Sequence, residues 1–359
     1  MSMDEKLLAA IPEPLLAWFR TNKRDLPWRR DREPYHVWLS EIMLQQTRVE
    51  AVKAYYLRFL EAAPDVQALA ALPEDALFKL WEGLGYYNRA RNLQKCARRL
   101  SEQGGAFPGT KAELLTLPGI GDYTAGAIAS ICFEEPAAAV DGNVLRVCAR
   151  LLNDDRPVDT PAYKKELDAA LSAVYPKGRC GDFTQSLMEL GATVCVPNGA
   201  PHCDVCPLRE LCRARRAGTM LQLPVKLPKR AKRTEQRTVF LLCCGDRIAM
   251  RKRPENGLLA GLWELPNTDR LLDEAAVGTW ATEQRLGDTE LRSARDGRHI
   301  FTHIVWEMRC YTLTCETAVP QFTWVTAEQL QGSFSLPTAF RQFIDTDGMG
   351  SSVILPKNV

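Results

Sequence analysis

The sequence predicts two domains of different class, an all-helical domain followed across a basic linker by a smaller α+β domain. Three observations predict this division. From residue 4 to 217, apolar side chains recur at spacings of three and four in stretches of about 10 to 20 residues. The segment "LPVKLPKRAKR", 223–233, then combines two prolines with five basic residues. After it the apolar spacing changes to two, which is typical of strands.

We therefore expect a helical domain at 1–222, a linker at 223–237 and an α+β domain at 238–359. Within the last domain, "RTVFLLCCGDRIAMRKR" predicts a β-hairpin that turns near Gly245 and Asp246. The stretch "HIVWEMRCYTLTC" contains a second alternating strand, and "TAEQLQGSFSLPTAFRQFI" predicts a short helix near its end. The class is thus a multidomain combination of α and α+β folds.

Length and composition are those of an ordinary soluble protein with two domains. The 359 residues are 46% hydrophobic and 25% charged, and no stretch reaches the roughly 18 apolar residues of a membrane helix. The start, "MSMDEKLLAA", lacks the basic and apolar parts of a secretion signal. We expect a cytoplasmic protein without a membrane partner. Ten basic and two acidic residues fall within 209–237, which suits either a polyanion or a solvated surface.

The twelve cysteines divide into two groups. Eight are scattered among apolar neighbours and are interpreted as small core residues. The other four follow the pattern Cys195-x7-Cys203-x2-Cys206-x5-Cys212. Four thiolates this close suit zinc or an iron–sulfur cluster, and a single C-x2-C pair favours the wider cluster. Simple packing of four thiols is the alternative.

The stretch "LPGIGDYTAGAIA", 117–129, predicts a turn that leads into a helix of small residues. Gly119 and Gly121 allow two backbone segments to approach closely, and the free N–H groups at a helix start can hold a phosphate. A plain helix–helix turn is the alternative.

Two carboxylates are placed in environments that we expect to be opposite. Glu41 lies within the apolar run "VWLSEIMLQQTRV", so burial should raise its pKa. Asp141 in "VDGNV" precedes a helix, where free N–H groups should keep its pKa low, although it could simply cap that helix. A proton donor paired with an anion is the arrangement that breaks glycosidic bonds.

Together these motifs resemble the helix–hairpin–helix DNA glycosylases that carry a 4Fe–4S cluster. Within that superfamily, "LPWR", "SEIMLQQT", "GLGYYNRARNL" and "VDGNV" resemble the adenine DNA glycosylases of the MutY family, and the likeness spans nearly the whole chain. The resemblance implies that the four clustered cysteines hold a 4Fe–4S cluster. The gap between Cys195 and Cys203 is seven residues, where the family usually has six.

One position distinguishes two chemistries within this superfamily. Relatives that resemble endonuclease III carry a lysine where this chain has Tyr123, and a tyrosine cannot form their Schiff base with the sugar. The resemblance therefore implies a monofunctional hydrolase of N-glycosyl bonds. It would act in base excision repair, as a monomer, on adenine opposite 8-oxoguanine or guanine in duplex DNA.

The resemblance also implies roles for individual residues. Glu41 would protonate adenine, Asp141 would stabilise the cationic sugar, and Asn143 and Tyr123 would hold the sugar and the carboxylates. The residues that would line or support the adenine pocket are Arg24, Trp28, Arg29 and Glu189. Those that would enter the duplex are Gln46 and Tyr86, and the hairpin that would hold DNA contains Gly119 and Gly121.

The C-terminal segment "GLLAGLWELP" resembles the MutT-like, or Nudix, domain that this family uses to recognise 8-oxoguanine. The acidic R-E-x-x-E-E-x-G run of active Nudix hydrolases is missing, so a reader domain without hydrolase activity is expected. The family's Phe-Ser-His loop corresponds to Phe301, Thr302 and His303 here.

Three other functions stay open from the sequence. A bifunctional glycosylase/lyase would nick DNA without alkali. A non-catalytic iron–sulfur protein would use the hairpin and basic linker only to bind DNA. A nucleotide pyrophosphatase would need Mg²⁺ and the missing carboxylates.

Overall fold

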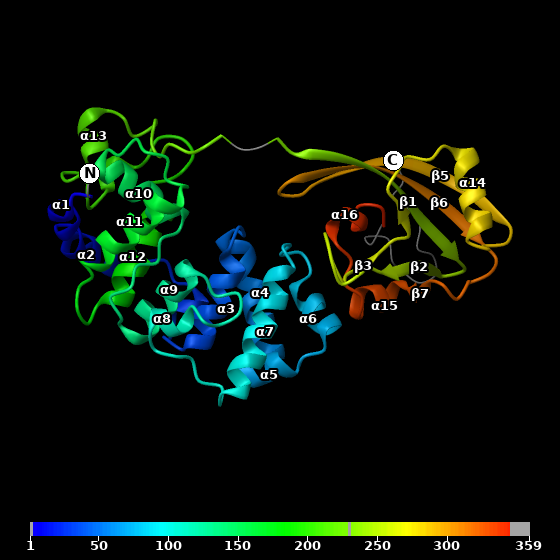
Figure 1. Ribbon diagram of the computed structural model, residues 1–359, viewed down its shortest axis with the longest axis horizontal. Helices are drawn as coiled ribbons and strands as arrows, with labels where there is room; N and C mark the ends of the chain where they lie inside the picture. Colours follow the sequence, from blue (N-terminus) through cyan, green and yellow to red (C-terminus); the bar gives the residue numbers. More distant parts are fainter. Residues whose placement is uncertain (1–2, 229–230, 345–359) are drawn as a thin grey trace. The chain divides into compact units, whose positions relative to one another are not determined.

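The computed structural model describes residues 3–228 and 231–344, which form two compact units (Figure 1). The first unit comprises Met1–Ala71 and Arg91–Pro228, and the second comprises Leu72–Ala90 and Lys229–Val359. The short segment Leu72–Ala90 therefore groups with the C-terminal part of the chain, although its pattern is helical like that of its neighbours. Within the described residues no helix is both long enough and apolar enough to span a bilayer.

The predicted helical pattern up to residue 217 is confirmed. The helices are α1 (Glu5–Ala9), α2 (Pro12–Asn22), α3 (Pro34–Leu44), α4 (Val49–Ala62), α5 (Val66–Ala71), α6 (Glu74–Trp81), α7 (Asn88–Glu102), α8 (Lys111–Leu114), α9 (Asp122–Phe133), α10 (Gly142–Leu152), α11 (Pro161–Ser172), α12 (Cys180–Thr193) and α13 (Arg213–Ala217), with 3₁₀ turns η1 (Pro27–Arg29) and η2 (Cys203–Val205).

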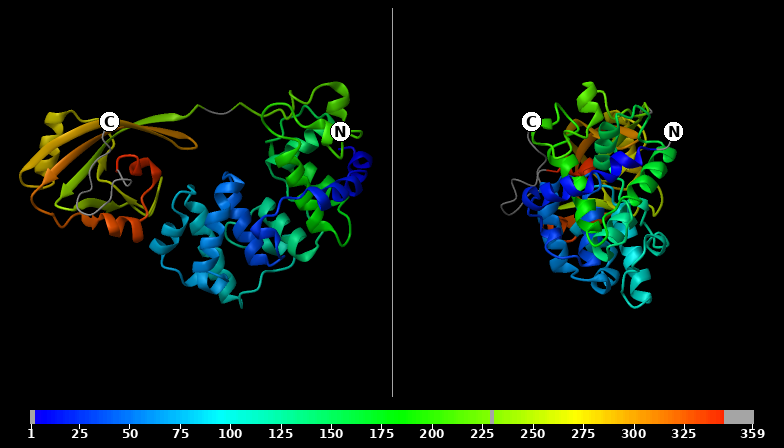
Figure 2. Two further views of the ribbon diagram at one scale, coloured as in Figure 1. Left: turned by 180° about the vertical axis from the view of Figure 1, so that it is seen from behind. Right: turned by 90° about the vertical axis from the view of Figure 1, so that its left-hand side faces the viewer.

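Helix α9 is central to the first unit because its small residues let neighbouring segments approach. Helices α3 and α12 both pack against it, and α10 packs against α12. A Cβ on Gly126 would lie 2.0 Å from the carbonyl oxygen of Ala138, so this position has no room for a side chain. The ribbon in Figure 2 follows these helices from two further directions.

The turn between α8 and α9 has the close approach that its glycines predicted. Gly119 has φ +74°, and a Cβ there would lie 2.5 Å from the Cβ of Asn92. Gly121 is the residue before α9 and leaves the helix start without a side-chain cap.

The second unit contains a mixed sheet in the order β3-β2-β1-β6-β5, in which β1 and β6 run parallel. Strands β4 and β7 pair with β1 and β2, respectively. The elements are β1 (Arg233–Cys244), β2 (Arg247–Lys252), β3 (Trp263–Glu264), β4 (Asn267–Thr268), α14 (Glu274–Glu283), β5 (Thr289–Ile300), β6 (Ile304–Cys315), β7 (Thr323–Thr326), α15 (Ala327–Gly332) and α16 (Thr338–Arg341).

Alternation along β1 gives the sheet two buried faces. Val239 and Leu241 join the core beneath α15 and α16, whereas Phe240 and Leu242 join the core beneath α14. Phe240 stacks on Trp280 of α14 with ring centroids 3.5 Å apart. The sheet therefore lies between two helical layers, as the ribbon also shows (Figure 2).

The hairpin predicted around Gly245 and Asp246 is confirmed, because Cys244 pairs with Arg247 across the turn. Strand β1 begins at Arg233, inside the segment 223–237 that we assigned to the linker, since its first residues pair with β6 from Ile304 onward. The other domain bounds remain predictions, and residues 1–2, 229–230 and 345–359 lie outside the described chain.

Candidate functional site

The first unit contains a cavity of about 530 Å³ that brings together many of the residues predicted to act on the base. Its lining comes from the turn η1, from α3 and its C-terminal end, and from the N-terminal parts of α9 and α10 and the middle of α12. The predicted residues that line it are Arg24, Trp28, Arg29, Glu41, Gln46, Tyr123, Asp141, Asn143 and Glu189.

Glu41 is a buried acid on α3 that is hydrogen-bonded to Tyr123. Its residue is 6% exposed, and burial raises the pKa of Glu41 to about 7, as the sequence predicted. The hydroxyl of Tyr123, from α9, donates a hydrogen bond to Glu41 Oε2 and acts in the opposite direction on that pKa. Near neutral pH a large share of Glu41 therefore carries a proton.

Asp141 caps α10, and each oxygen of its carboxylate accepts a hydrogen bond. Oδ1 accepts the backbone N–H of Val144 at 2.7 Å, and Oδ2 accepts the side-chain amide of Asn143 at 2.7 Å. The prediction of a low pKa is wrong, because burial raises the pKa of Asp141 above its usual value and outweighs these hydrogen bonds. The capping geometry itself is confirmed.

Arg146 orients Asn143 toward Asp141, a role that we did not predict from the sequence. Its Nη2 donates to Asn143 Oδ1 and to the carbonyl of Gly191, both at 2.8 Å, and its Nε donates to the carbonyl of Cys195 at 2.8 Å. With its oxygen so occupied, the Asn143 amide presents its N–H to the carboxylate. The spacing of three between Asn143 and Arg146 on one helix was the available signal.

Glu189, on α12, is fully buried and ionised in a cluster of arginines. Its carboxylate accepts the Arg24 backbone N–H at 3.1 Å, the Arg24 guanidinium at 2.7 and 3.0 Å, and Arg29 Nη2 at 2.8 Å. Burial opposes ionisation, but these donors hold the pKa of Glu189 below its usual value. Trp28 packs edge-on against Tyr56, with ring centroids 5.5 Å apart. The cluster fixes one wall of the cavity.

The cavity has further polar walls that sequence reasoning missed. Gln185 precedes Glu189 by one helical turn, a spacing from which its position on the same face could have been found. The other polar or sulfur-bearing residues of the lining gave no such signal. They are Ser40, Gln45, Thr47 and Met188.

Two residues predicted to enter the duplex have an unusual backbone. Gln46 has φ +60° and Tyr86 has φ +49°. Residues other than glycine rarely adopt this left-handed backbone conformation. Gln46 is exposed and lines the cavity, whereas Tyr86 is 48% exposed and belongs to the second unit. Gly119 and Gly121 lie at the α8–α9 turn and are not among the described residues of the cavity lining.

Cys195, Cys203, Cys206 and Cys212 line a second, small cavity of about 30 Å³. Arg150 Nη1 donates to Cys195 Sγ at 3.3 Å, and two more arginines belong to the lining. Among the described residues, no three histidine, cysteine or acidic side chains are arranged to hold a metal ion. The four thiols thus converge on one place.

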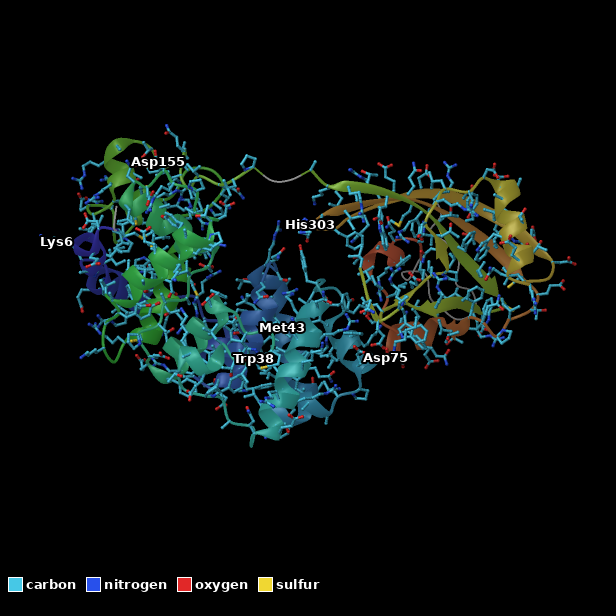
Figure 3. All side chains as sticks on the ribbon, in the orientation of Figure 1. Lys6, Trp38, Met43, Asp75, Asp155 and His303 are labelled. Atoms are coloured by element: carbon cyan, nitrogen blue, oxygen red, sulfur yellow. The ribbon has the colours of Figure 1, made fainter. Side chains whose placement is uncertain are left out.

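The predicted lesion-reading loop connects β5 and β6, and Figure 3 shows His303 at the tip of this hairpin. The carbonyl of Phe301 accepts Lys232 Nζ at 2.8 Å, and the carbonyl of His303 accepts the Arg233 N–H at 2.9 Å. The ring of Phe301 packs on Trp306, with centroids 4.9 Å apart. Thr302, between Phe301 and His303, is exposed.

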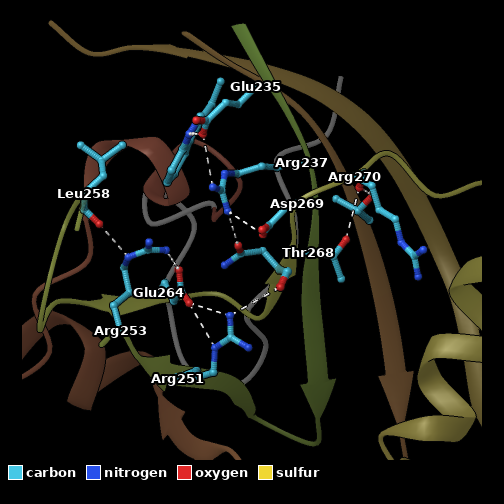
Figure 4. Close-up of polar contacts among 12 residues, drawn as sticks. Glu235, Arg237, Arg251, Arg253, Leu258, Glu264, Thr268, Asp269 and Arg270 are labelled. Carbon is cyan, nitrogen blue, oxygen red and sulfur yellow. Dashed lines mark hydrogen bonds and ion pairs between the residues drawn. The ribbon is translucent and has the colours of Figure 1, made fainter. Parts of the chain in front are cut away.

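Glu264, the carboxylate within "GLLAGLWELP", is occupied by arginines (Figure 4). It is 1% exposed, and it accepts Arg251 Nε at 3.1 Å and Nη2 at 2.7 Å together with Nη1 of Arg253. A carboxylate held in this way is not available to bind Mg²⁺, which agrees with the missing acidic run.

Comparison with known proteins agrees with both parts of the chain. The model of the HhH-GPD superfamily of base excision DNA repair proteins matches residues 39–173, and that of the NUDIX domain matches 238–346. These matches confirm the predicted fold class.

Relatives named adenine DNA glycosylase are similar over most of their length. The rat protein is 36% identical over 93% of this chain and 77% of its own, and the human protein is 36% identical over 91% and 72%. A relative from Buchnera aphidicola subsp. Baizongia pistaciae is 32% identical over 81% and 82%.

Two solved structures are similar to the helical part. A thermostable thymine-DNA glycosylase has a TM-score of 0.52 at 30% identity, covering 59% of this chain and 98% of its own. A non-covalent Endonuclease III–DNA complex has a TM-score of 0.50 at 26% identity, covering 60% and 98%. The sequence relatives show that the chain belongs to the adenine DNA glycosylase family.

Proposed function

We propose that the protein is a monofunctional DNA glycosylase that excises adenine paired with 8-oxoguanine or guanine in duplex DNA. The observation that carries this proposal is the buried Glu41, with a pKa of about 7, in the same cavity as Asp141. The adenine DNA glycosylase relatives and the DNA-bound structural neighbour support duplex DNA as the partner.

In this proposal Glu41 is the general acid. A proton placed on a ring nitrogen of adenine makes the base a better leaving group, and an acid with a pKa near 7 transfers a proton efficiently at neutral pH. Tyr123 keeps the carboxyl oriented through its hydrogen bond to Oε2.

Asp141 then stabilises the positive charge that develops on the sugar as the base leaves. Its carboxylate is fixed in one orientation by the Val144 N–H and the Asn143 amide, so it need not reorganise during the reaction. Arg146, 7% exposed, adds a positive charge near this carboxylate that favours its ionised form.

The arginine-bound Glu189 gives the cavity a rigid polar wall against which an adenine can be oriented. Trp28 supplies an aromatic surface beside it. Water would be the nucleophile, because the described lining of the cavity contains no lysine that could form a Schiff base with the sugar.

We also propose that Cys195, Cys203, Cys206 and Cys212 hold a 4Fe–4S cluster. Four thiols line one cavity, and their spacing contains a single C-x2-C pair, which suits a group of several irons. Three arginines in the lining, Arg150, Arg209 and Arg215, can balance the negative charge of such a group. When bound, the cluster would crosslink the loop that carries these cysteines.

The loop of Phe301, Thr302 and His303 is proposed to read 8-oxoguanine. The carbonyls of Phe301 and His303, which flank Thr302, accept hydrogen bonds from Lys232 and Arg233, respectively. The Thr302 side chain is therefore exposed on a fixed backbone.

The test measures free adenine and strand integrity on a duplex with one A:8-oxoguanine pair. The proposal expects adenine release, with strand breaks only after alkali, and much slower release by Glu41→Gln, by a factor on the order of 10² to 10⁴. Strand breaks without alkali would move the protein to the lyase class. A protein that binds the duplex but releases no adenine would be a non-catalytic DNA-binding protein.

A further inference from the structure

The segment Leu72–Ala90 is attached to the C-terminal part of the second unit through Glu82. Glu82 Oε1 accepts the backbone N–H of Leu336 at 2.8 Å and a hydrogen bond from Arg341 Nη2, and Oε2 accepts Lys79 Nζ at 2.8 Å. The Glu82 side chain is only 14% exposed. A largely enclosed carboxylate with three hydrogen-bond donors, two of them cationic, makes a specific connection between α6 and the segment of Leu336 and Arg341.

Lys79 extends the same connection. Besides Glu82, its ammonium donates to the carbonyls of Leu330 at 2.9 Å and Phe334 at 3.1 Å, so all three of its N–H groups have acceptors. Tyr87, which directly follows Tyr86, is buried, and its hydroxyl lies 3.4 Å from Ser335 Oγ. The loop that follows α6 is therefore fixed at both ends.

Tyr86 lies between these two fixed ends, and its backbone is held in the left-handed conformation. Trp81 Nε1 donates to the carbonyl of Gly85 at 3.1 Å, and Arg89 Nη2 donates to the carbonyls of Leu84 at 2.9 Å and Gly85 at 3.1 Å. The Tyr86 hydroxyl then accepts a hydrogen bond from Thr302 Oγ1 at 3.3 Å. The residue predicted to enter the duplex thus contacts the residue predicted to read the lesion.

We propose that Glu82 is a positioning residue that sets Tyr86 against Thr302, so that both act together on the oxidised base pair. This inference rests on the proposed preference for 8-oxoguanine. An exposed tyrosine and an exposed threonine joined by one long hydrogen bond cannot keep their own alignment, because such a contact is weak. The alignment must come from the Glu82 connection behind them, which has three donors.

The experiment compares single-turnover adenine excision from A:8-oxoguanine and A:G duplexes for the full-length parent protein and its variants. Glu82→Gln removes the charge that Lys79 and Arg341 share while keeping the shape. We expect the rate ratio of A:8-oxoguanine to A:G to fall about tenfold, which is about 1.4 kcal/mol. The rate on A:G should fall much less.

A matched control is available in the same segment. Asp75 on α6, labelled in Figure 3, pairs with Lys252 at 3.0 Å, but their side chains are 45% and 40% exposed. Since exposed pairs contribute little, Asp75→Asn should change the ratio less than twofold. An equal loss in Asp75→Asn and Glu82→Gln would show that the contacts are only structural.

Arg341→Met tests the same connection from the other side and serves if Glu82→Gln does not fold. We expect it to lower the ratio, and the Glu82→Gln/Arg341→Met double variant to be no worse than Glu82→Gln alone, because both changes break one contact. Additive losses, or folded variants with the parent's ratio, would overturn the inference. A parent that does not discriminate between the duplexes would instead refute the proposed preference.

Discussion

Removing the hydroxyl of Tyr123 should make the excision reaction tolerate a higher pH. In the structure that hydroxyl donates a hydrogen bond to Glu41 Oε2 and lowers the pKa of Glu41, against the larger effect of burial. Tyr123→Phe keeps the ring that helps to bury Glu41 and deletes only the donor. The ionised form of Glu41 therefore loses its stabilising partner.

The size of the shift follows from the strength of that hydrogen bond. A hydrogen bond to a charged group contributes about 1.5 kcal/mol or more, and one pKa unit corresponds to about 1.4 kcal/mol. The pKa of Glu41 should therefore rise from about 7 to about 8. Because protonated Glu41 is the active form, the rate should fall about tenfold per pH unit above this pKa.

The assay follows adenine release from an A:G duplex at enzyme concentrations well below saturation, from pH 5.5 to about 9.5. Under these conditions the profile reports the free protein. We expect a lower plateau in Tyr123→Phe, since a positioning contact is lost, and an alkaline limb about one pH unit higher than in the parent. An unchanged limb, or one displaced to lower pH, would refute the role assigned to this hydrogen bond.

Five further predictions concern the acid, the reader loop, DNA binding and the cysteines. Glu41→Gln should lower excision by a factor on the order of 10² to 10⁴ while duplex affinity stays within a few-fold; a gel-shift titration beside the excision assay checks both, and full activity would refute the acid role. The same variant should melt at a higher temperature than the parent at pH 8. The pKa of Glu41 in the folded protein lies above its unfolded value of 4.5, so the folded parent protein loses stability as pH rises from about 4.5 through about 7. Equal melting temperatures at pH 8 would contradict the burial of this carboxyl. Thr302→Ala with His303→Ala should reduce the preference for 8-oxoguanine over guanine and spare excision from A:G, as measured by the two single-turnover rates; an unchanged preference would exclude this loop. Duplex affinity should fall steeply between about 50 and 200 mM salt, and the purified protein should be brown with four irons per chain; a flat salt titration, or zinc in place of iron, would contradict these expectations.

Much of the fold could be predicted because local sequence patterns determine its elements. The change of apolar spacing after the linker and the Gly245-Asp246 turn each act through neighbouring residues. The start of β1 was placed too late because the strand begins with exposed polar residues, and only pairing with β6 shows that they are strand. Local patterns contain no information about that partner.

Local sequence also limits how well the pKa shifts of the two carboxylates could be predicted. The apolar neighbours of Glu41 in the sequence are also its neighbours in space, so its raised pKa was predictable. For Asp141 the sequence shows the helix start but not the burial, and burial decides the direction of the shift. Arg146 and the Glu82 connection depend on residues distant in sequence, such as Cys195 and Arg341.

The most direct test of the account is a titration of the Glu41 carboxyl itself in the folded protein. ¹³C NMR of glutamate-labelled protein, with Glu41→Gln to assign the resonance, follows its ionisation from pH 4 to about 9. The account predicts a midpoint at about 7. A midpoint near 4.5, the value of an ordinary glutamate, would mean that Glu41 is ionised at neutral pH and would contradict its role as the proton donor.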